Sequence, residues 1–126
     1  MSKIELATKN APSAIGPYSQ AIEANGLLFC SGQIAIDPAT SALAEGGVEA
    51  QAEQCCKNVA ALLEARGLST DAVVKTTVFI TNMADFGKVN EIYAKYFTAP
   101  YPARSCVGVA SLPKGALVEV EVIAAL

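Results

Sequence analysis

The chain has 126 residues, which suits one domain with one hydrophobic core, so we treat residues 1–126 as a single domain. Its formal net charge of −3 argues against a general affinity for nucleic-acid phosphates, because that affinity requires clustered lysine and arginine. The chain contains no histidine, which excludes Ser-His-Asp and Cys-His catalysis and histidine-based zinc or iron sites.

Charged residues make up 17% of the chain, whereas a typical soluble domain has about 25%. We therefore expect other copies of the chain to cover part of the surface, because obligate homo-oligomer interfaces are more apolar than free surface. A monomer with an unusually apolar surface is the alternative. No apolar run is long enough to cross a bilayer, and the N-terminus lacks the apolar stretch of a signal peptide. We expect a cytoplasmic protein with four reduced thiols, Cys30, Cys55, Cys56 and Cys106.

In chain order, the first predicted elements are a short edge strand over residues 3–7 and a loop over residues 10–17. Two strand-like runs follow, over residues 19–24 and 27–36. Asn25-Gly26 lies between them, and Asn-Gly between two such runs is the strongest short-range signal of a β-hairpin. The sequence therefore predicts a hairpin that turns at Asn25-Gly26.

The rest of the chain alternates helices with strands. Apolar residues recur at helical spacing over residues 48–66, and Gly67 predicts the end of that helix. The other predictions are a turn-rich loop, a centrally placed strand and a second helix, over residues 37–47, 73–81 and 83–96. Two final strands, over residues 101–110 and 117–125, are expected to form a terminal strand pair. This order predicts an α+β domain with a mixed sheet and two helices on one face. The other face would be bare, which again favours self-association.

Charged residues stand out in the last two predicted strands. Arg104 begins one apolar run, and Glu119 and Glu121 interrupt another. Buried charges need a partner or a function, since an unpaired buried charge is costly. An arginine that binds a carboxylate, close to a glutamate that takes a proton, predicts a site for a small organic acid. An ion pair that only closes the sheet explains the same residues equally well, and a one-residue change of register decides whether Arg104 and Glu119 share a face.

Three further stretches carry polar residues at unusual places. A rigid Gly-Pro turn precedes Tyr18, and Ser31-Gly32-Gln33 interrupts an apolar strand. Glycine within a strand often marks the close approach of a ligand or another backbone, although a plain turn or bulge is the simpler explanation. Asn90 falls within the apolar stripe of the second predicted helix, where it either bonds a buried backbone group or faces a pocket.

Six blocks of sequence carry a resemblance to a known family: residues 16–21, 31–34, 90–93, 102–107, 112–116 and 118–121. In this order they resemble the RidA (YjgF) family of reactive-intermediate deaminases over nearly the whole chain. The most specific part is Pro102-Ala103-Arg104, followed by Glu119 fifteen residues after the arginine. The segment 98–101 is shorter than in many relatives, which leaves the substrate preference open.

The resemblance implies a chorismate-mutase-like α+β fold and a homotrimer with a barrel-like core and clefts between subunits. It implies hydrolysis of 2-aminoacrylate, 2-iminopropanoate and 2-iminobutanoate to 2-oxo acids and ammonia, without a cofactor or a metal. By motif, Arg104 would bind the substrate carboxylate and Glu119 would act on the attacking water. The remaining pocket residues implied by the resemblance are Tyr18, Ser31, Gly32, Asn90 and the backbone of Cys106.

Two other functions are open at this point. RNA cleavage or inhibition of translation has been linked to the same family, but the negative charge and the absence of histidine count against it. A non-catalytic module that binds small carboxylates, or exposed hydrophobic chains in the manner of a chaperone, would keep Arg104 without needing Glu119. A nucleophilic Cys106 is a further alternative, since a cationic neighbour lowers a thiol pKa.

Overall fold

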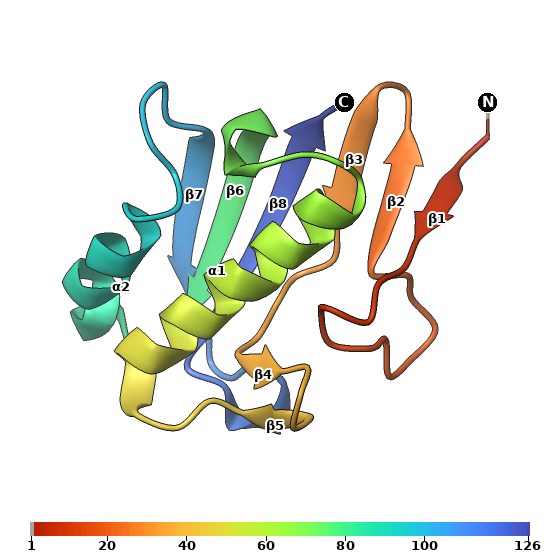
Figure 1. The fold of residues 1–126 in the computed structure, drawn as a ribbon. Coiled ribbons are helices and arrows are strands. Elements are labelled where there is room, and N and C mark those ends of the chain that lie inside the picture. Colours follow the sequence, from red (N-terminus) through yellow and green to blue (C-terminus); the bar gives the residue numbers. More distant parts are fainter. Residues whose placement is uncertain (1) are drawn as a thin grey trace.

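A six-stranded mixed sheet forms the centre of the domain in the computed structural model, which describes residues 2–126 (Figure 1). Neighbouring strands in the sheet are not all consecutive in the sequence, because the C-terminal strand lies in the middle of the sheet. Across the sheet, the strands are β1 (Ile4–Leu6), β2 (Ala21–Ala24), β3 (Leu27–Cys30), β8 (Val118–Ala125), β6 (Val73–Ile80) and β7 (Ala103–Gly108). Neighbours pair antiparallel except for β6 and β7, which are parallel.

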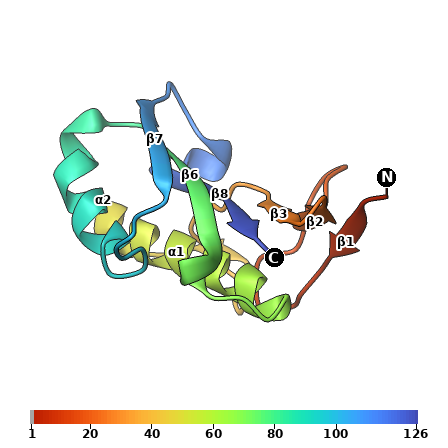
Figure 2. The same ribbon diagram turned by 90° about the horizontal axis from the view of Figure 1, so that it is seen from above.

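Both α-helices lie on the same face of the sheet, as expected from the sequence. Helix α1 (Gly47–Ala65) runs diagonally across β6, β8 and β3, and α2 (Phe86–Tyr93) lies at the β7 edge (Figures 1 and 2). A small second sheet pairs β4 (Ile36–Asp37) with β5 (Ala42–Leu43) below the start of α1. No helix within residues 2–126 is long and apolar enough to cross a membrane. The α+β class is confirmed, and the opposite face of the sheet carries no α-helix among the described elements (Figure 2).

The hairpin of β2 and β3 forms where the sequence predicts it. Asn25 and Gly26 both have positive φ, at 53° and 76°, which is the backbone that a two-residue hairpin turn requires. Strand β3 stops at Cys30, well before the predicted end at Ile36. The chain leaves the ladder at Ser31-Gly32, and Gln33 then makes one antiparallel bridge to Val120. This early end matters because it opens space beside β8.

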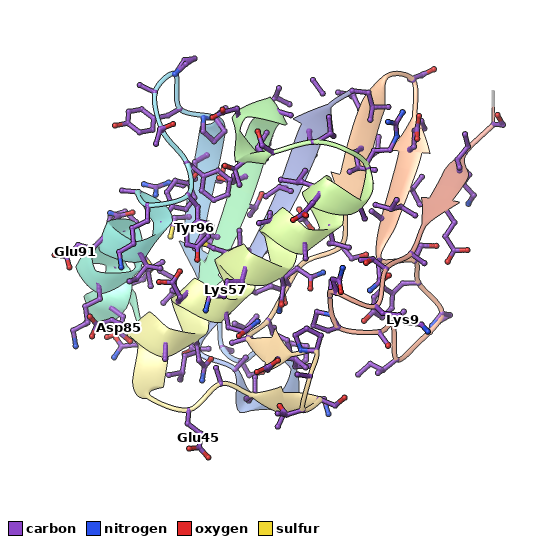
Figure 3. All side chains as sticks on the ribbon, in the orientation of Figure 1. Lys9, Glu45, Lys57, Asp85, Glu91 and Tyr96 are labelled. Carbon is purple, nitrogen blue, oxygen red and sulfur yellow. The ribbon has the colours of Figure 1, made fainter. Side chains whose placement is uncertain are left out.

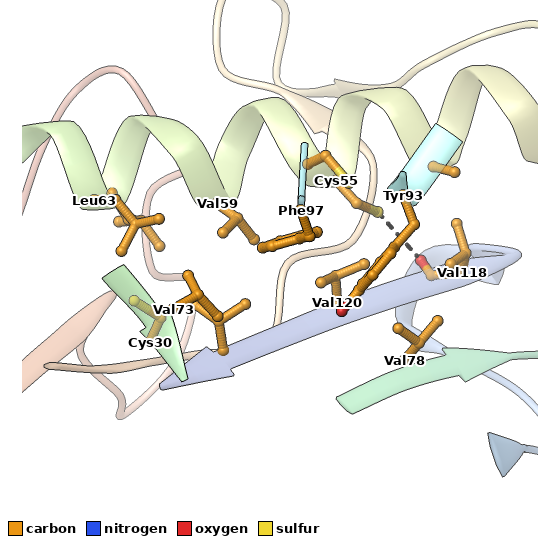
Figure 4. Packing of buried hydrophobic residues seen from close by; sticks show 14 of the residues in the cluster. Cys30, Cys55, Val59, Leu63, Val73, Val78, Tyr93, Phe97, Val118 and Val120 are labelled. Carbon is orange, nitrogen blue, oxygen red and sulfur yellow. Dashed lines mark hydrogen bonds between the residues drawn. The ribbon is translucent and has the colours of Figure 1, made fainter. Parts of the chain in front are cut away.

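Helix α1 supplies most of the covering layer. It ends one residue before the predicted end, and Gly67 follows with φ at 76°, as expected for a glycine that closes a helix. Its apolar stripe packs on β6 and β8 (Figure 4); the buried members are Val48, Ala52, Cys55, Cys56, Val59, Leu62 and Leu63. Charged residues such as Lys57 and Glu45 point away from this core (Figure 3).

Two buried polar residues of α1 fix loops that lie near β8. The Asn58 amide nitrogen donates to the carbonyls of Ile34 and Ile36, at 3.2 Å and 2.8 Å. The Gln51 side-chain oxygen accepts the backbone N–H of Leu117 at 2.8 Å. A buried amide without such partners would be destabilising by roughly 1–3 kcal/mol. These bonds therefore hold Leu117, directly before β8, and the segment after Ser31 in fixed positions.

The pairing of the last two strands differs from the expectation of a terminal strand pair. Strand β6 lies between β7 and β8, so β7 and β8 do not pair with each other. The connection through η2 (Met83–Asp85) and α2 crosses over the sheet and returns β7 parallel to β6, as a strand–helix–strand unit does. The helix predicted over residues 83–96 is shorter in the structure, where the 3-10 turn η2 precedes α2 and α2 ends at Tyr93.

Candidate functional site

Arg104 lies on β7 at the edge of the sheet, on the face that the helices cover. Its register partner on β6 is Thr76, which is fully buried under the helices. The guanidinium reaches α2, where Arg104 Nη1 donates to Asn90 Oδ1 at 2.7 Å. Its Cζ atom lies 4.9 Å from the ring centroid of Tyr93 and 5.5 Å from that of Phe86. The side chain is therefore held by one amide and two aromatic rings while remaining exposed to solvent.

A hollow of about 460 Å³ adjoins this guanidinium, and we call it the edge hollow. Its lining residues are Asn90, Tyr93, Ala94, Tyr101, Pro102 and Arg104. Among residues 2–126, Asn90 is the one hydrogen-bond partner of the Arg104 guanidinium, so the rest of that group is free to bind an anion. A planar carboxylate fits this arrangement, because an arginine offers two parallel N–H groups to its two oxygens.

Glu119 lies on the other side of the sheet. On β8 it is in register with Phe79 of β6, whereas Arg104 is in register with Thr76, three positions earlier on that strand. Side chains alternate between the two faces along a strand, so residues an odd number of positions apart point to opposite faces. Val118 and Val120, on either side of Glu119, are both buried under the helices. Arg104 and Glu119 of one chain therefore cannot meet.

The carboxyl of Glu119 is half-buried against the backbone where β3 has ended. A Cβ atom added to Gly32 would lie 2.1 Å from Glu119 Oε2, so only glycine leaves room for the carboxyl there. Burial raises the pKa of Glu119, and the negative charge of Glu121 raises it further. A carboxyl whose pKa is shifted towards neutrality exchanges protons more readily at physiological pH, as general acid–base catalysis requires.

A second hollow, of about 400 Å³, opens on the helix-free face in front of Glu119. We call it the open-face hollow; its lining includes Ile15, Tyr18, Ser31, Gly32, Glu119 and Glu121. Tyr18 is half exposed and presents its phenol from the loop, where its N–H donates to the Gly16 carbonyl at 2.8 Å. The Ser31 hydroxyl donates to the Ser19 carbonyl at 2.6 Å, which fixes the loop and leaves the serine without a base.

Sequence reasoning assigned no role to Gln20, the residue that organises the loop before Tyr18. This buried side chain donates to the carbonyls of Thr8 and Pro12, at 3.0 Å and 2.8 Å, and accepts from the Thr8 N–H at 2.7 Å. Tyr93, which contacts Arg104, was likewise recognisable only as an apolar helix position. Neither residue is charged or next to a glycine or proline, so no local signal distinguishes it.

Cys106 lies on the same face of β7 as Arg104, in register with buried Val78. Burial raises the pKa of its thiol and Arg104 lowers it only in part, so the thiol is not activated. Burial also raises the pKa of Cys30 and Cys56, each to about 12. The four cysteines are free thiols, and none has the lowered pKa of a nucleophile.

The residues singled out from the sequence thus form two groups within one chain. Tyr18, Ser31, Gly32 and Glu119 line the open-face hollow. Asn90 and Arg104 line the edge hollow, and Cys106 lies beside them on β7. Each group contains half of a plausible site for an organic acid: a cation for a carboxylate in one, and a proton-transfer group in the other.

Comparison with known proteins shows the family to which the chain belongs. Residues 8–126 match the family described as Endoribonuclease L-PSP. A 2-iminobutanoate/2-iminopropanoate deaminase of Salmonella typhimurium is 51% identical over 127 residues, covering 98% of this chain and 98% of the relative. The chain belongs to the RidA family. The sequence resemblance carried by the Pro102–Arg104 block and Glu119 is thereby confirmed at the level of the family.

Solved structures of RidA-family proteins share the whole fold of this one. The Rid-family protein YyfA from Yersinia pestis superposes with a TM-score of 0.96 at 56% identity, covering 99% of this chain and 100% of that one. Escherichia coli TdcF, solved with bound serine, superposes with a TM-score of 0.93 at 43% identity, and each chain is covered to 98%. The RidA-type α+β fold predicted from the sequence is therefore the fold of this RidA-family chain.

Proposed function

We propose that this protein hydrolyses 2-imino acids and their enamine tautomers, such as 2-aminoacrylate, 2-iminopropanoate and 2-iminobutanoate, to 2-oxo acids and ammonia. The observation that carries the proposal is Glu119: a carboxyl with a pKa raised by burial, pressed against Gly32 and open to a hollow without an activated nucleophile. An imine carbon is already electrophilic, so water and one base suffice. The Salmonella relative named for this activity supports the same assignment.

The site we propose is a cleft between two copies of the chain, in a homotrimer with a barrel-like core. Arg104 of one copy would face Glu119 of the next, because the two side chains lie on opposite faces of one sheet. Apolar side chains on the helix-free face support such an assembly, since Phe29 and Val107 are 40% and 42% exposed. Burying the exposed part of such a side chain stabilises an assembly by roughly 0.5–1 kcal/mol.

The reaction needs only the groups assigned to this cleft. Arg104 would bind the substrate carboxylate, assisted by the backbone at Cys106, and Tyr18, Ser31 and Asn90 would line the cleft. Charge-assisted hydrogen bonds of this type contribute roughly 1.5–3 kcal/mol each. Ionised Glu119 would take a proton from water as the water oxygen bonds to C2, and the C=N double bond becomes a single bond to the amine.

The protonated Glu119 would then return that proton to the amine nitrogen. Glu119, ionised again, would take the proton of the C2 hydroxyl as the C–N bond breaks and the hydroxyl becomes the carbonyl of the 2-oxo acid; the departing ammonia would then take up that proton as ammonium. Overall, one iminium carboxylate and one water give one 2-oxo acid and one ammonium ion, with no redox change and no covalent enzyme intermediate. General acid–base catalysis of this kind contributes on the order of 10²–10⁴ in rate.

The assay that tests this proposal measures ammonia and 2-oxo acid released from freshly generated 2-aminoacrylate, with and without the protein. We expect release to be faster with the protein and to depend on Arg104 and Glu119. Tight binding of the 2-oxo acid without any acceleration would instead identify a carboxylate-binding module. Cleavage of RNA in place of deamination would contradict the proposal; the carboxyls of Glu119 and Glu121 in the open-face hollow repel phosphate and disfavour that outcome. We also propose a cytoplasmic location, consistent with four free thiols.

A further inference from the structure

A buried hydroxyl pair lies beneath Arg104 and has no part in the chemistry described so far. Thr76, in the middle of β6, is fully buried, and its hydroxyl oxygen lies 2.8 Å from the hydroxyl oxygen of Tyr93 on α2. Tyr93 is only 7% exposed, and its ring also stacks on Phe97 with centroids 4.5 Å apart. Valine and phenylalanine at these two positions would fill the same space without a polar pair in the core, so the pair needs an explanation.

We propose that Tyr93 is a positioning residue for Arg104: the bond to Thr76 fixes the Tyr93 ring, and the ring fixes the guanidinium that receives the substrate carboxylate. This inference rests on the proposed function, in which Arg104 binds that carboxylate. It adds Tyr93 and Thr76 to the residues that determine substrate binding, although neither is assigned a contact with the substrate.

The register between β6 and β7 supports this inference. Thr76 is the partner of Arg104 across β6 and β7, so its hydroxyl lies on the same face and directly beside the arginine. A tyrosine that bonds to this hydroxyl therefore has its ring under the side chain of Arg104, as the 4.9 Å separation of ring centroid and Cζ confirms. A cation over an aromatic face within about 6 Å is attracted by the ring.

Asn90 restrains the same guanidinium through a hydrogen bond. It lies three residues before Tyr93 on α2, so both side chains occupy one face of the helix. Asn90 accepts from Nη1 at 2.7 Å, while Arg104 Cζ lies over the Tyr93 ring at 4.9 Å from its centroid. Together the two contacts limit rotation of a side chain that would otherwise be free at an exposed sheet edge.

A restrained guanidinium loses less conformational freedom when it binds a carboxylate, so the substrate binds more tightly. The contact between the Tyr93 ring and Arg104 affects binding of the substrate carboxylate both before and during the reaction. It is remote from Glu119, the proposed base on the other face of the sheet. Loss of the ring should therefore raise KM and the Kd of the 2-oxo acid product while kcat changes little. A residue that only stabilised the fold would lower the amount of active protein and leave KM unchanged.

The test compares Tyr93→Leu, which removes ring and hydroxyl, with Tyr93→Phe, which removes only the bond to Thr76. Tyr96→Phe is the matched control, because Tyr96 donates its hydroxyl to Glu53 of α1 and makes no ring contact with Arg104. Each variant is assayed for kcat and KM on 2-aminoacrylate and for the Kd of 2-oxobutanoate by calorimetry. Circular dichroism and light scattering check the fold and the assembly.

We expect Tyr93→Leu to raise KM and the product Kd about tenfold with kcat within about threefold of the parent, and Tyr93→Phe to raise both about threefold. Tyr96→Phe should leave KM and the product Kd unchanged. Parental KM and Kd in both Tyr93 variants would overturn the inference. If Tyr93→Leu does not assemble, the test depends on Tyr93→Phe alone: a raised KM supports the inference, and an unchanged KM overturns it.

The Arg104→Lys variant separates this inference from the proposed function. If Arg104→Lys binds the product and turns over substrate like the parent, Arg104 does not bind the carboxylate and the proposed function is wrong. If Arg104→Lys is impaired as expected, adding Tyr93→Leu to it should weaken product binding by much less than tenfold, because the guanidinium that the ring positions is gone. A full additional loss in the double variant would show that Tyr93 acts independently of Arg104.

Discussion

Replacing Gly32 with alanine tests whether the carboxyl of Glu119, the proposed base, is placed by the absence of a side chain. The new Cβ would lie 2.1 Å from Glu119 Oε2 and 2.8 Å from its carboxyl carbon, whereas ordinary contact begins at 3.4 Å. The oxygen must therefore move by at least about 1.3 Å. Gly32 does not have the positive φ that would strain an alanine, and the displaced group is the end of a flexible side chain. The fold should therefore survive.

A displacement of about 1 Å at a reacting group costs about 100-fold in rate, which corresponds to about 2.7 kcal/mol of transition-state stabilisation. We expect kcat/KM of Gly32→Ala to fall by that factor in the ammonia-release assay, while the free energy of unfolding changes by less than about 1 kcal/mol. Gly87→Ala is the control, since a Cβ there meets no atom within 4 Å and it lies in α2. Parental activity in Gly32→Ala would refute the placement of Glu119 as the base.

Four further substitutions follow from the same site. Arg104→Lys should lose most of its kcat/KM with the fold intact, because lysine keeps the charge but not the planar fork; steady-state kinetics with circular dichroism check this. Glu119→Gln should bind 2-oxobutanoate in calorimetry yet lose on the order of 10²–10⁴ in kcat, and parental turnover would mean that another group activates the water. Because kcat/KM falls as pH drops through the raised pKa of Glu119, Glu121→Gln should move that acid limb to lower pH by removing the second cause of the shift; an unmoved limb would contradict the assignment. Cys106→Ser should keep a substantial fraction of the activity, since burial leaves the thiol unactivated, and a folded but inactive variant would show that the sulfur takes part.

The pKa of Glu119 also predicts how stability depends on pH. Its folded-state pKa lies above its ordinary value, so folding favours the protonated form, and this contribution is lost as pH rises through the folded-state pKa. Above that pKa the buried negative charge destabilises the fold. Glu119→Gln should therefore gain more free energy of unfolding relative to the parent at pH 7 than at pH 4, as chemical denaturation at the two pH values would show. An equal difference at both values would mean that Glu119 titrates as in water.

Local patterns predicted the main helices and strands of the fold, but not the short strands β4 and β5, the second of which lies inside the predicted loop 37–47. Asn25-Gly26 requires the two positive φ values that the hairpin has, and the apolar stripe before Gly67 gave α1 to within one residue at each end. Strand neighbours could not be predicted in this way. The C-terminal strand β8 lies between β3 and β6, so the pairing of the two final strands was wrong. Which strand lies between two others depends on contacts between residues far apart in the chain.

The candidate site shows the same limit. The residue types of Arg104 and Glu119 suggested a carboxylate site, but their relation depended on a register that the sequence left open. The structure puts them on opposite faces, since Thr76 and Phe79 are their partners on β6. Gly32 was noticeable as a glycine in a strand, yet only the position of the Glu119 carboxyl explains it. Tyr93 gave no sequence signal because its role depends on Arg104 of a different element.

Subunit complementation tests most directly the claim that Arg104 and Glu119 of different copies share one cleft. Arg104→Lys and Glu119→Gln proteins, each nearly inactive alone, are unfolded together in equal amounts and refolded; the parent treated in the same way is the control. In a trimer assembled at random, about three quarters of the products contain both chains. Each of these has one complete cleft out of three, so about a quarter of the parental activity should return. A mixture that assembles but stays inactive would show that both residues act within one chain, which contradicts the account.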